Sequence, residues 1–246
     1  MEDKRSWAYW YDVINTKERN DLQFYARQME KDDLALEIAC GTGRIYLDML
    51  KDGYNVHGLD ISEKMLTKLE EKADKIGLET KELFHENVSN MELDQKYDVI
   101  YYPFNSIAHI DGDIESQLNA FKNIHTHLGE NGVFAFDIYV MDFDSIAEYG
   151  ELKSKEFTHN GTNYKFEMWS EMASEVEQRI KSYNRIINID EGKIEWQAEH
   201  ELSLYPKQQI ELILMNTGFR NYEFYDGFTE EPIDSESNHM GIVAEK

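Results

Sequence analysis

The chain has 246 residues and a mass of 29.0 kDa, enough for one α/β core with an elaboration or for two small domains. Its 49 acidic residues outnumber its 25 basic ones, and the net charge of -24 repels phosphate backbones and anionic membranes. The one cysteine, Cys40, excludes a disulfide framework and a cysteine-built metal site.

The sequence contains no apolar run of about eighteen residues, and no apolar segment follows its charged first residues. Its eight histidines are scattered and form no metal-ligand pattern. We therefore expect a cytoplasmic protein, a monomer or a homodimer, with no bound metal and no membrane or nucleic-acid partner.

Residues 34–60 hold the most informative pattern in the chain. The apolar residues Leu34 to Ala39 predict a buried strand, and the turn after it carries Gly41 and Gly43. Glycine suits a turn that bends sharply and lets backbone N–H groups approach a ligand without a Cβ in the way. A second predicted strand, 55–59, ends at Asp60, at about the spacing at which nucleotide-binding sheets hold ribose hydroxyls. The pattern predicts a nucleoside across the strand ends of an open α/β sheet.

The glycine spacing also narrows the class of nucleoside. A dinucleotide-binding turn carries a third glycine three positions after the second, so that pyrophosphate can lie on the helix N-terminus. Tyr46 occupies that position after Gly43. The sequence thus disfavours a nicotinamide-dependent oxidoreductase and favours a ligand without pyrophosphate.

Strands and helices alternate through residue 140, which predicts a parallel sheet with right-handed crossovers. Ser62 is the expected N-cap of the second helix of this series. The remaining predicted elements, in chain order, are helix 43–51, helix 62–76, strand 81–85, strand 97–102, helix 113–128, a turn at 129–132 and strand 133–140.

The C-terminal part changes character, because turn signals there separate long strand-like runs. The turns Asn160-Gly161 and Asp190-Glu191-Gly192 are hairpin signals. The predicted elements are antiparallel strands 162–171, 175–187 and 193–204, helix 207–216 after Pro206, and strands 219–227 and 240–245.

The string Glu-Ile-Ala-Cys-Gly-Thr-Gly-Arg at residues 37–44, with Asp60 behind it, resembles motif I of the class I S-adenosylmethionine-dependent methyltransferases. The resemblance runs through most of residues 5–140 and points to the small-molecule, N-methyltransferase-like branch. It implies a Rossmann-like, seven-stranded, mostly parallel α/β sheet with an antiparallel β insertion after the fifth strand. The expected domains are a cofactor-binding domain, 1–140 with 207–246, and an inserted β cap, 141–206.

The resemblance also implies a set of residues around S-adenosylmethionine. Asn87 stands where such families usually place an aspartate, and its side-chain oxygen is expected to accept from the adenine amino group. The expected cofactor-binding residues are Tyr11, Glu37, Ala39, Gly41, Gly43, Asp60, Ile61, Met65, Asn87, Val88 and Phe104.

Methyl transfer from a sulfonium is an in-line displacement that needs alignment, exclusion of water and sometimes a base. His109 follows the fourth predicted strand and is the candidate base, while Asp137 and Tyr139 are expected to line the acceptor pocket. The sequence therefore predicts an enzyme that methylates an N or O atom of a small-molecule acceptor.

Two other interpretations stay open. A nucleic-acid methyltransferase is disfavoured by the net charge and because Tyr102-Pro103-Phe104 has a single proline where base-gripping motifs have two. A non-catalytic protein that kept the cofactor-binding fold is the second alternative.

Overall fold

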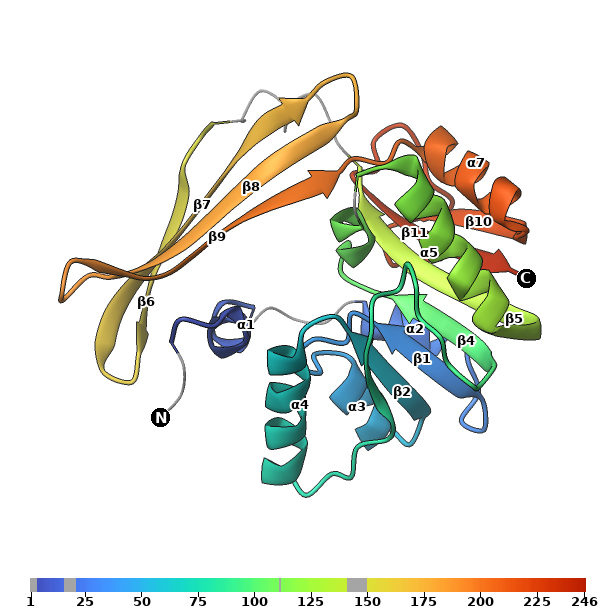
Figure 1. Cartoon of the computed structure of the whole chain (residues 1–246), viewed down its shortest axis with the longest axis horizontal. Helices are drawn as coiled ribbons and strands as arrows, with labels where there is room; N and C mark the ends of the chain where they lie inside the picture. Colours follow the sequence, from blue (N-terminus) through green and yellow to red (C-terminus); the bar gives the residue numbers. More distant parts are fainter. Residues whose placement is uncertain (1–3, 16–20, 111, 141–149) are drawn as a thin grey trace. The chain divides into compact units, whose positions relative to one another are not determined.

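The computed structural model describes four stretches of the chain: residues 4–15, 21–110, 112–140 and 150–246. The chain divides into two compact units (Figure 1). We call Glu18–Val140 together with Tyr205–Lys246 the core unit, and Met1–Lys17 together with Met141–Leu204 the β unit.

The core unit is built on one sheet whose strands are β1 (Leu34–Ile38), β2 (Asn55–Asp60), β3 (Leu83–His85), β4 (Tyr97–Tyr102), β5 (Leu128–Tyr139), β10 (Arg220–Asp226) and β11 (His239–Glu245). These seven strands lie in the order β10-β11-β5-β4-β1-β2-β3. Strand β11 pairs antiparallel with both neighbours, and the other pairs are parallel. The predicted seven-stranded, mostly parallel sheet is confirmed, and β10 and β11 close it as an antiparallel pair.

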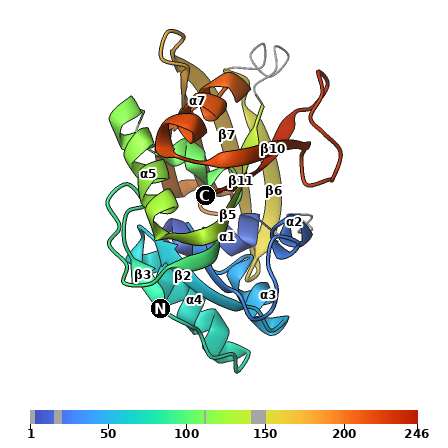
Figure 2. The same cartoon turned by 90° about the vertical axis from the view of Figure 1, so that its right-hand side faces the viewer.

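Helices cover both faces of this sheet: α2 (Leu22–Ala26), α3 (Tyr46–Lys51), α4 (Glu63–Lys75), α5 (Ile114–His127) and α7 (Lys207–Thr217). Helices α5 and α7 pack on one face and α2, α3 and α4 on the other, as Figure 2 shows from the side. The central strands β1 and β4 are buried on both faces, which explains their nearly continuous apolar sequences. Among the described residues, no helix is long and apolar enough to cross a membrane.

Local signals set several helix ends. The Ser62 hydroxyl accepts from the backbone N–H of Met65 at 3.4 Å and caps α4, as predicted. The Asp113 carboxylate caps α5 by accepting from the N–H of Ser116 at 2.8 Å. Helix α7 ends at Gly218, whose φ of 100° is the left-handed conformation that favours glycine.

The prediction of a separate turn before the fifth strand, at residues 129–132, is wrong, because these residues lie inside β5. The register between β4 and β5 shifts there: Tyr97 pairs with Leu128, while Val99 pairs with Val133. A Cβ on Gly132 would lie 2.9 Å from the Cβ of Leu128, so the chain passes close to itself at this irregularity.

The β unit contains α1 (Trp7–Ile14) and an antiparallel sheet of β6 (Lys153–His159), β7 (Thr162–Ser174), β8 (Arg179–Asn188) and β9 (Lys193–Ser203). The sequence analysis predicted three of these four strands and missed β6. Strand β6 is an edge strand, and most of its residues are exposed, so it lacks the apolar alternation of a half-buried strand. Side chains of α1 form the core of the unit with the sheet, and the rings of Trp7 and Trp196 stack at 4.5 Å.

Candidate functional site

The carboxyl ends of the parallel strands β1, β2, β4 and β5 meet at one edge of the core sheet, where ligands of open α/β sheets bind. All but one of the predicted site residues lie in the core unit, on the segments that leave this edge. The exception is Tyr11, which belongs to α1 of the β unit, where its ring meets the edge of Trp7 at 5.8 Å.

The turn after β1 has three residues with positive φ: Ala39 at 54°, Gly41 at 55° and Gly43 at 80°. A Cβ on Gly41 would lie 3.9 Å from the carbonyl oxygen of Ala39 and 4.0 Å from Oδ2 of Asp60, so no neighbour crowds this position. A Cβ on Gly43 would lie 2.8 Å from Leu47 and 2.9 Å from Leu69. We had expected both glycines to leave room for a ligand, but Gly43 leaves room for the packing of α3 and α4.

Asp60 is buried at the end of β2 with 7% of its surface exposed. Its Oδ2 accepts from the N–H of Gly41 and its Oδ1 from the N–H of Ser62, both at 2.8 Å. A carboxylate offers about four acceptor positions, so these two bonds leave capacity for two hydroxyl donors. The residue therefore fits a ribose diol and braces the glycine turn at the same time. Burial raises the pKa of Asp60, and the two backbone N–H groups oppose that rise.

Four of the expected cofactor-binding residues follow β2 and β3. Ile61 is 66% exposed, which leaves an apolar side chain beside Asp60 available to a flat ring. Met65 lies in the first turn of α4, and Val88 is buried in the core. The side-chain oxygen of Asn87 accepts from the N–H of Ser89 at 2.9 Å, so contact with an adenine amino group needs its second lone pair.

Glu37 is the next-to-last residue of β1, and its carboxyl group is buried. The hydroxyl of Tyr101 donates to its Oε2 at 2.9 Å. Burial raises the pKa of Glu37 to about 8, although Tyr101 and the Arg44 guanidinium both act to lower it. Burial therefore favours the protonated form of this carboxyl group.

Arg44 follows the glycine turn and connects it to two other segments. Its two terminal nitrogens donate to both oxygens of Asp21, at 3.1 and 2.5 Å, in a bidentate pair. Its guanidinium lies 4.6 Å from the centre of the Phe104 ring, in the loop after β4. Phe104 is 41% exposed and has a φ of 65°, which is rare for a residue with a side chain.

Asp137 lies near the end of β5 and is 1% exposed. Its Oδ1 accepts from the Tyr25 hydroxyl and from the N–H of Phe104, both at 2.5 Å. Its Oδ2 accepts from the N–H of Asn105 and from Nε2 of His239, both at 2.9 Å. Burial and the neighbouring Asp137 raise the pKa of Tyr25 well above its usual range, so this phenol stays a donor.

Tyr139 and His109 are more accessible than Asp137. Tyr139 is 54% exposed, and its ring stacks on that of His239 at 4.8 Å. His109 is exposed at the end of the short helix η1 (Ser106–His109), which follows the Phe104 loop.

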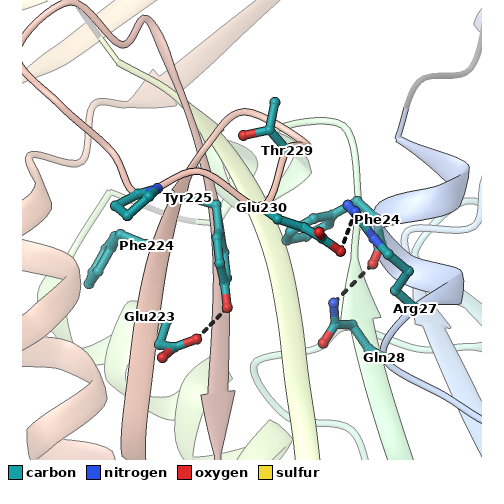
Figure 3. A pocket seen from close by; sticks show the side chains of 9 residues that line it. Phe24, Arg27, Gln28, Glu223, Phe224, Tyr225, Thr229 and Glu230 are labelled. Carbon is teal, nitrogen blue, oxygen red and sulfur yellow. Dashed lines mark hydrogen bonds and ion pairs between the residues drawn. The ribbon is translucent and has the colours of Figure 1, made fainter.

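The structure also shows a pocket of about 660 Å³ at the β10 edge of the core unit (Figure 3). Arg27 donates to Glu230 at 3.0 Å there, and the Tyr225 hydroxyl donates to Glu223. None of the predicted site residues lines this pocket, whose lining is Phe24, Arg27, Gln28, Glu223, Phe224, Tyr225, Thr229, Glu230 and Pro232.

Sequence reasoning missed the residues that connect the site: Tyr25, Arg44, Asn105 and His239. Tyr25 and His239 lie 112 and 102 positions from Asp137, so no local spacing links them to it. Arg44 was visible as the residue after the glycine turn, and its position there was the one available signal.

Comparisons with known proteins agree with this geometry. Residues 35–132 match the family described as a methyltransferase domain. A protein of Geobacillus sp. (strain WCH70) named as a methyltransferase is 28% identical, over 98% of each chain.

Two solved structures share the fold of both units. An S-adenosylmethionine-dependent methyltransferase from Clostridium acetobutylicum has a TM-score of 0.75 at 21% identity, covering 96% of each chain. The sugar N-methyltransferase KedS8 from Streptoalloteichus sp. has a TM-score of 0.75 at 16% identity, covering 96% of this chain and 92% of its own. Residues 35–132 thus form a methyltransferase domain, and the chain as a whole has the fold of S-adenosylmethionine-dependent methyltransferases.

Proposed function

We propose that this enzyme methylates the amino nitrogen of a small metabolite. The observation that supports this most is the fold shared with a sugar N-methyltransferase over 96% of the chain, the β unit included. A fold alone does not define a substrate, so the proposal also depends on charge and on the chemistry of the site.

The charge of the chain favours cationic ligands. A net charge of -24 creates a long-range field that attracts cations and repels nucleic acids. The sulfonium donor and an ammonium acceptor both gain from this field, whereas a phosphate-rich acceptor does not. The charge therefore favours an amine over a nucleic acid as the substrate.

In the proposed site the residues of the core unit hold the donor. Asp60 accepts from the two ribose hydroxyls, Gly41 leaves space for the nucleoside, and Ile61 packs against the adenine ring. The loop at Phe104 contacts the methionyl end. S-adenosylmethionine supplies an electrophilic methyl group, whose bond to sulfur breaks as its bond to the acceptor nitrogen forms.

An alkylammonium acceptor must lose its proton before its lone pair can attack. His109 is exposed on η1, and we propose it as the residue closest to this proton transfer. The acceptor's own acid–base equilibrium can supply the same step, and the two routes give different pH profiles.

We propose that side chains of the β unit bind the acceptor. Ser170 pairs with Ser182 across β7 and β8, and Ser182 pairs with His200 across β8 and β9. Three hydrogen-bonding side chains therefore stand in one row on one face of the sheet. Such a row suits an acceptor that carries hydroxyl groups. Burial lowers the pKa of His200, which keeps its ring neutral near pH 7.

A paired-substrate assay tests the proposed reaction. The purified chain is incubated with S-adenosylmethionine carrying a labelled methyl group and with amino sugars, amino acids and their N-acetylated counterparts. We expect methyl transfer to the free amines and none to the N-acetylated partners. Equal labelling of both partners contradicts N-methylation and indicates an oxygen target. Labelling of RNA or DNA alone contradicts a small-molecule acceptor.

The role of the β unit is tested in the same assay. The His200→Ala variant is expected to raise the KM for the amine while leaving the affinity for S-adenosylhomocysteine unchanged. The matched control is Gln197→Ala, on the same strand but pointing to the opposite face. An identical effect of the two substitutions on KM contradicts the proposed contact.

A further inference from the structure

The loop after β4 holds an unusual backbone. Phe104 and Asn105 have φ values of 65° and 52°, so two consecutive residues with side chains are left-handed. Each such residue costs about 1–2 kcal/mol relative to its ordinary conformation, with asparagine at the low end. A conformation of this cost persists only where the surrounding structure holds it in place.

The Asp137 carboxylate holds this loop. It accepts from the consecutive N–H groups of Phe104 and Asn105, one on each oxygen, and this pairing requires both groups to point the same way. The other position on each oxygen is filled by Tyr25 and His239. Four donors occupy about four acceptor positions, so the carboxylate has no capacity left for an acceptor substrate.

The same carboxylate connects the loop to the glycine turn. The ring of Tyr25 stacks on that of Tyr101 at 5.2 Å, and Tyr101 donates to Glu37 at the end of β1. On the other side, the ring of Phe104 lies under the guanidinium of Arg44. The Phe104 loop, which we propose contacts the donor's methionyl end, is therefore connected to the glycine turn through one buried carboxylate.

We propose that Asp137 is a positioning residue for the methyl donor, and not the acceptor ligand that its position at the end of β5 first predicts. It acts by fixing the left-handed Phe104–Asn105 pair against the glycine turn. The inference rests on the proposed contact between this loop and the methionyl end, and it is independent of which acceptor the enzyme uses.

The structure makes Asp137→Asn a sharp test. One oxygen faces the N–H of Phe104 and the other faces the N–H of Asn105, so either orientation of the new amide points its NH₂ group at a donor. The affinity for S-adenosylhomocysteine, measured by calorimetry, should fall about 10- to 100-fold, because the NH₂ group replaces an oxygen that accepts from two donors. The KM for the acceptor should change by less than about twofold, which is less than the loss of a direct hydrogen bond to the acceptor would cause.

The matched control is Asp98→Asn, on the neighbouring strand β4. The Asp98 carboxylate also accepts from a backbone N–H, that of Leu34 at 2.9 Å, but at the opposite edge of the sheet. We expect this variant to keep the wild-type affinity for S-adenosylhomocysteine. If Asp137→Asn does not fold, Tyr25→Phe removes one donor and keeps the stacked ring, and its affinity should fall about two- to tenfold.

A double-mutant cycle with Phe104→Gly identifies how Asp137 acts. Glycine adopts a φ of 65° without support, so Asp137→Asn should weaken binding much less in this background than in the wild type. Additive effects on affinity overturn the proposal, as does an unchanged affinity in a folded Asp137→Asn or Tyr25→Phe variant. A rise in acceptor KM at unchanged donor affinity makes Asp137 an acceptor ligand. If the substitutions change the affinity for S-adenosylhomocysteine as expected but the wild-type enzyme methylates no amine, the proposed reaction is contradicted and the positioning role of Asp137 is not.

Discussion

Replacing Asp60 tests the assignment of the nucleoside site most directly. If its carboxylate accepts from both ribose hydroxyls, Asp60→Ala removes two charge-assisted hydrogen bonds worth about 2–3 kcal/mol together. This corresponds to an increase of about 30- to 160-fold in the Kd for S-adenosylhomocysteine. Asp60 also braces Gly41 and Ser62, so part of any loss can arise from the turn itself.

A ligand without the 2′-hydroxyl separates these two contributions. In the wild type, 2′-deoxy-S-adenosylhomocysteine should bind about 5- to 13-fold more weakly, the share of one hydrogen bond of about 1–1.5 kcal/mol. In Asp60→Ala the same deletion should change the Kd by less than about twofold, because its partner is gone. Titration calorimetry measures all four values, with Asp98→Ala as the control for loss of a carboxylate elsewhere. An equal 2′-deoxy penalty in both proteins refutes the contact.

Three further predictions use the same site. Burial raises the pKa of Glu37 from 4.5 to about 8, so between these pH values the folded chain keeps a proton that the unfolded chain releases, and the free energy of unfolding falls as pH rises. The melting temperature of Glu37→Gln should depend less on pH in this range than that of the wild type, and equal slopes contradict the assignment. In chemical denaturation, Gly43→Ala should lower the free energy of unfolding by about 2–4 kcal/mol, because its Cβ crowds Leu47 and Leu69 and its φ is left-handed. Gly41→Ala has only the left-handed φ to overcome and should lower the same free energy by about 1–2 kcal/mol. His109→Gln should keep its rate within about tenfold, with the pH limb unchanged, if the acceptor loses its proton to solvent; a loss of more than about a thousandfold at intact donor affinity makes His109 the base.

Local chemistry accounts for the parts of the fold that the sequence predicted well. Ser62 caps α4 by bonding to Met65, three positions along the chain, and Asp60 lies one helix and one strand after the glycine turn. The apolar runs of the central strands are long because both of their faces are buried. Such signals lie within about 25 residues of one another, which is the range over which spacing carries information.

The parts that failed depend on contacts between distant segments. The four donors to Asp137 come from α2, the Phe104 loop and β11, and the positioning role that we propose for it depends on these long-range contacts. Gly43 has the sequence of a ligand-facing glycine, while Leu69 from the next helix fills its space. Edge strand β6 carries too little apolar pattern to be recognised.

The position of β11 has a consequence for synthesis of the protein. This strand lies between β5 and β10 and pairs with β5, although about a hundred residues separate Asp137 from Gly241 along the chain. Until β11 has left the ribosome, β5 pairs with β4 alone and has one unpaired edge that can associate with other chains. His239 lies in β11, so the four donors around Asp137 are complete only when this strand has been synthesised. A nascent or C-terminally truncated chain is therefore expected to be prone to aggregation and unable to bind the methyl donor tightly.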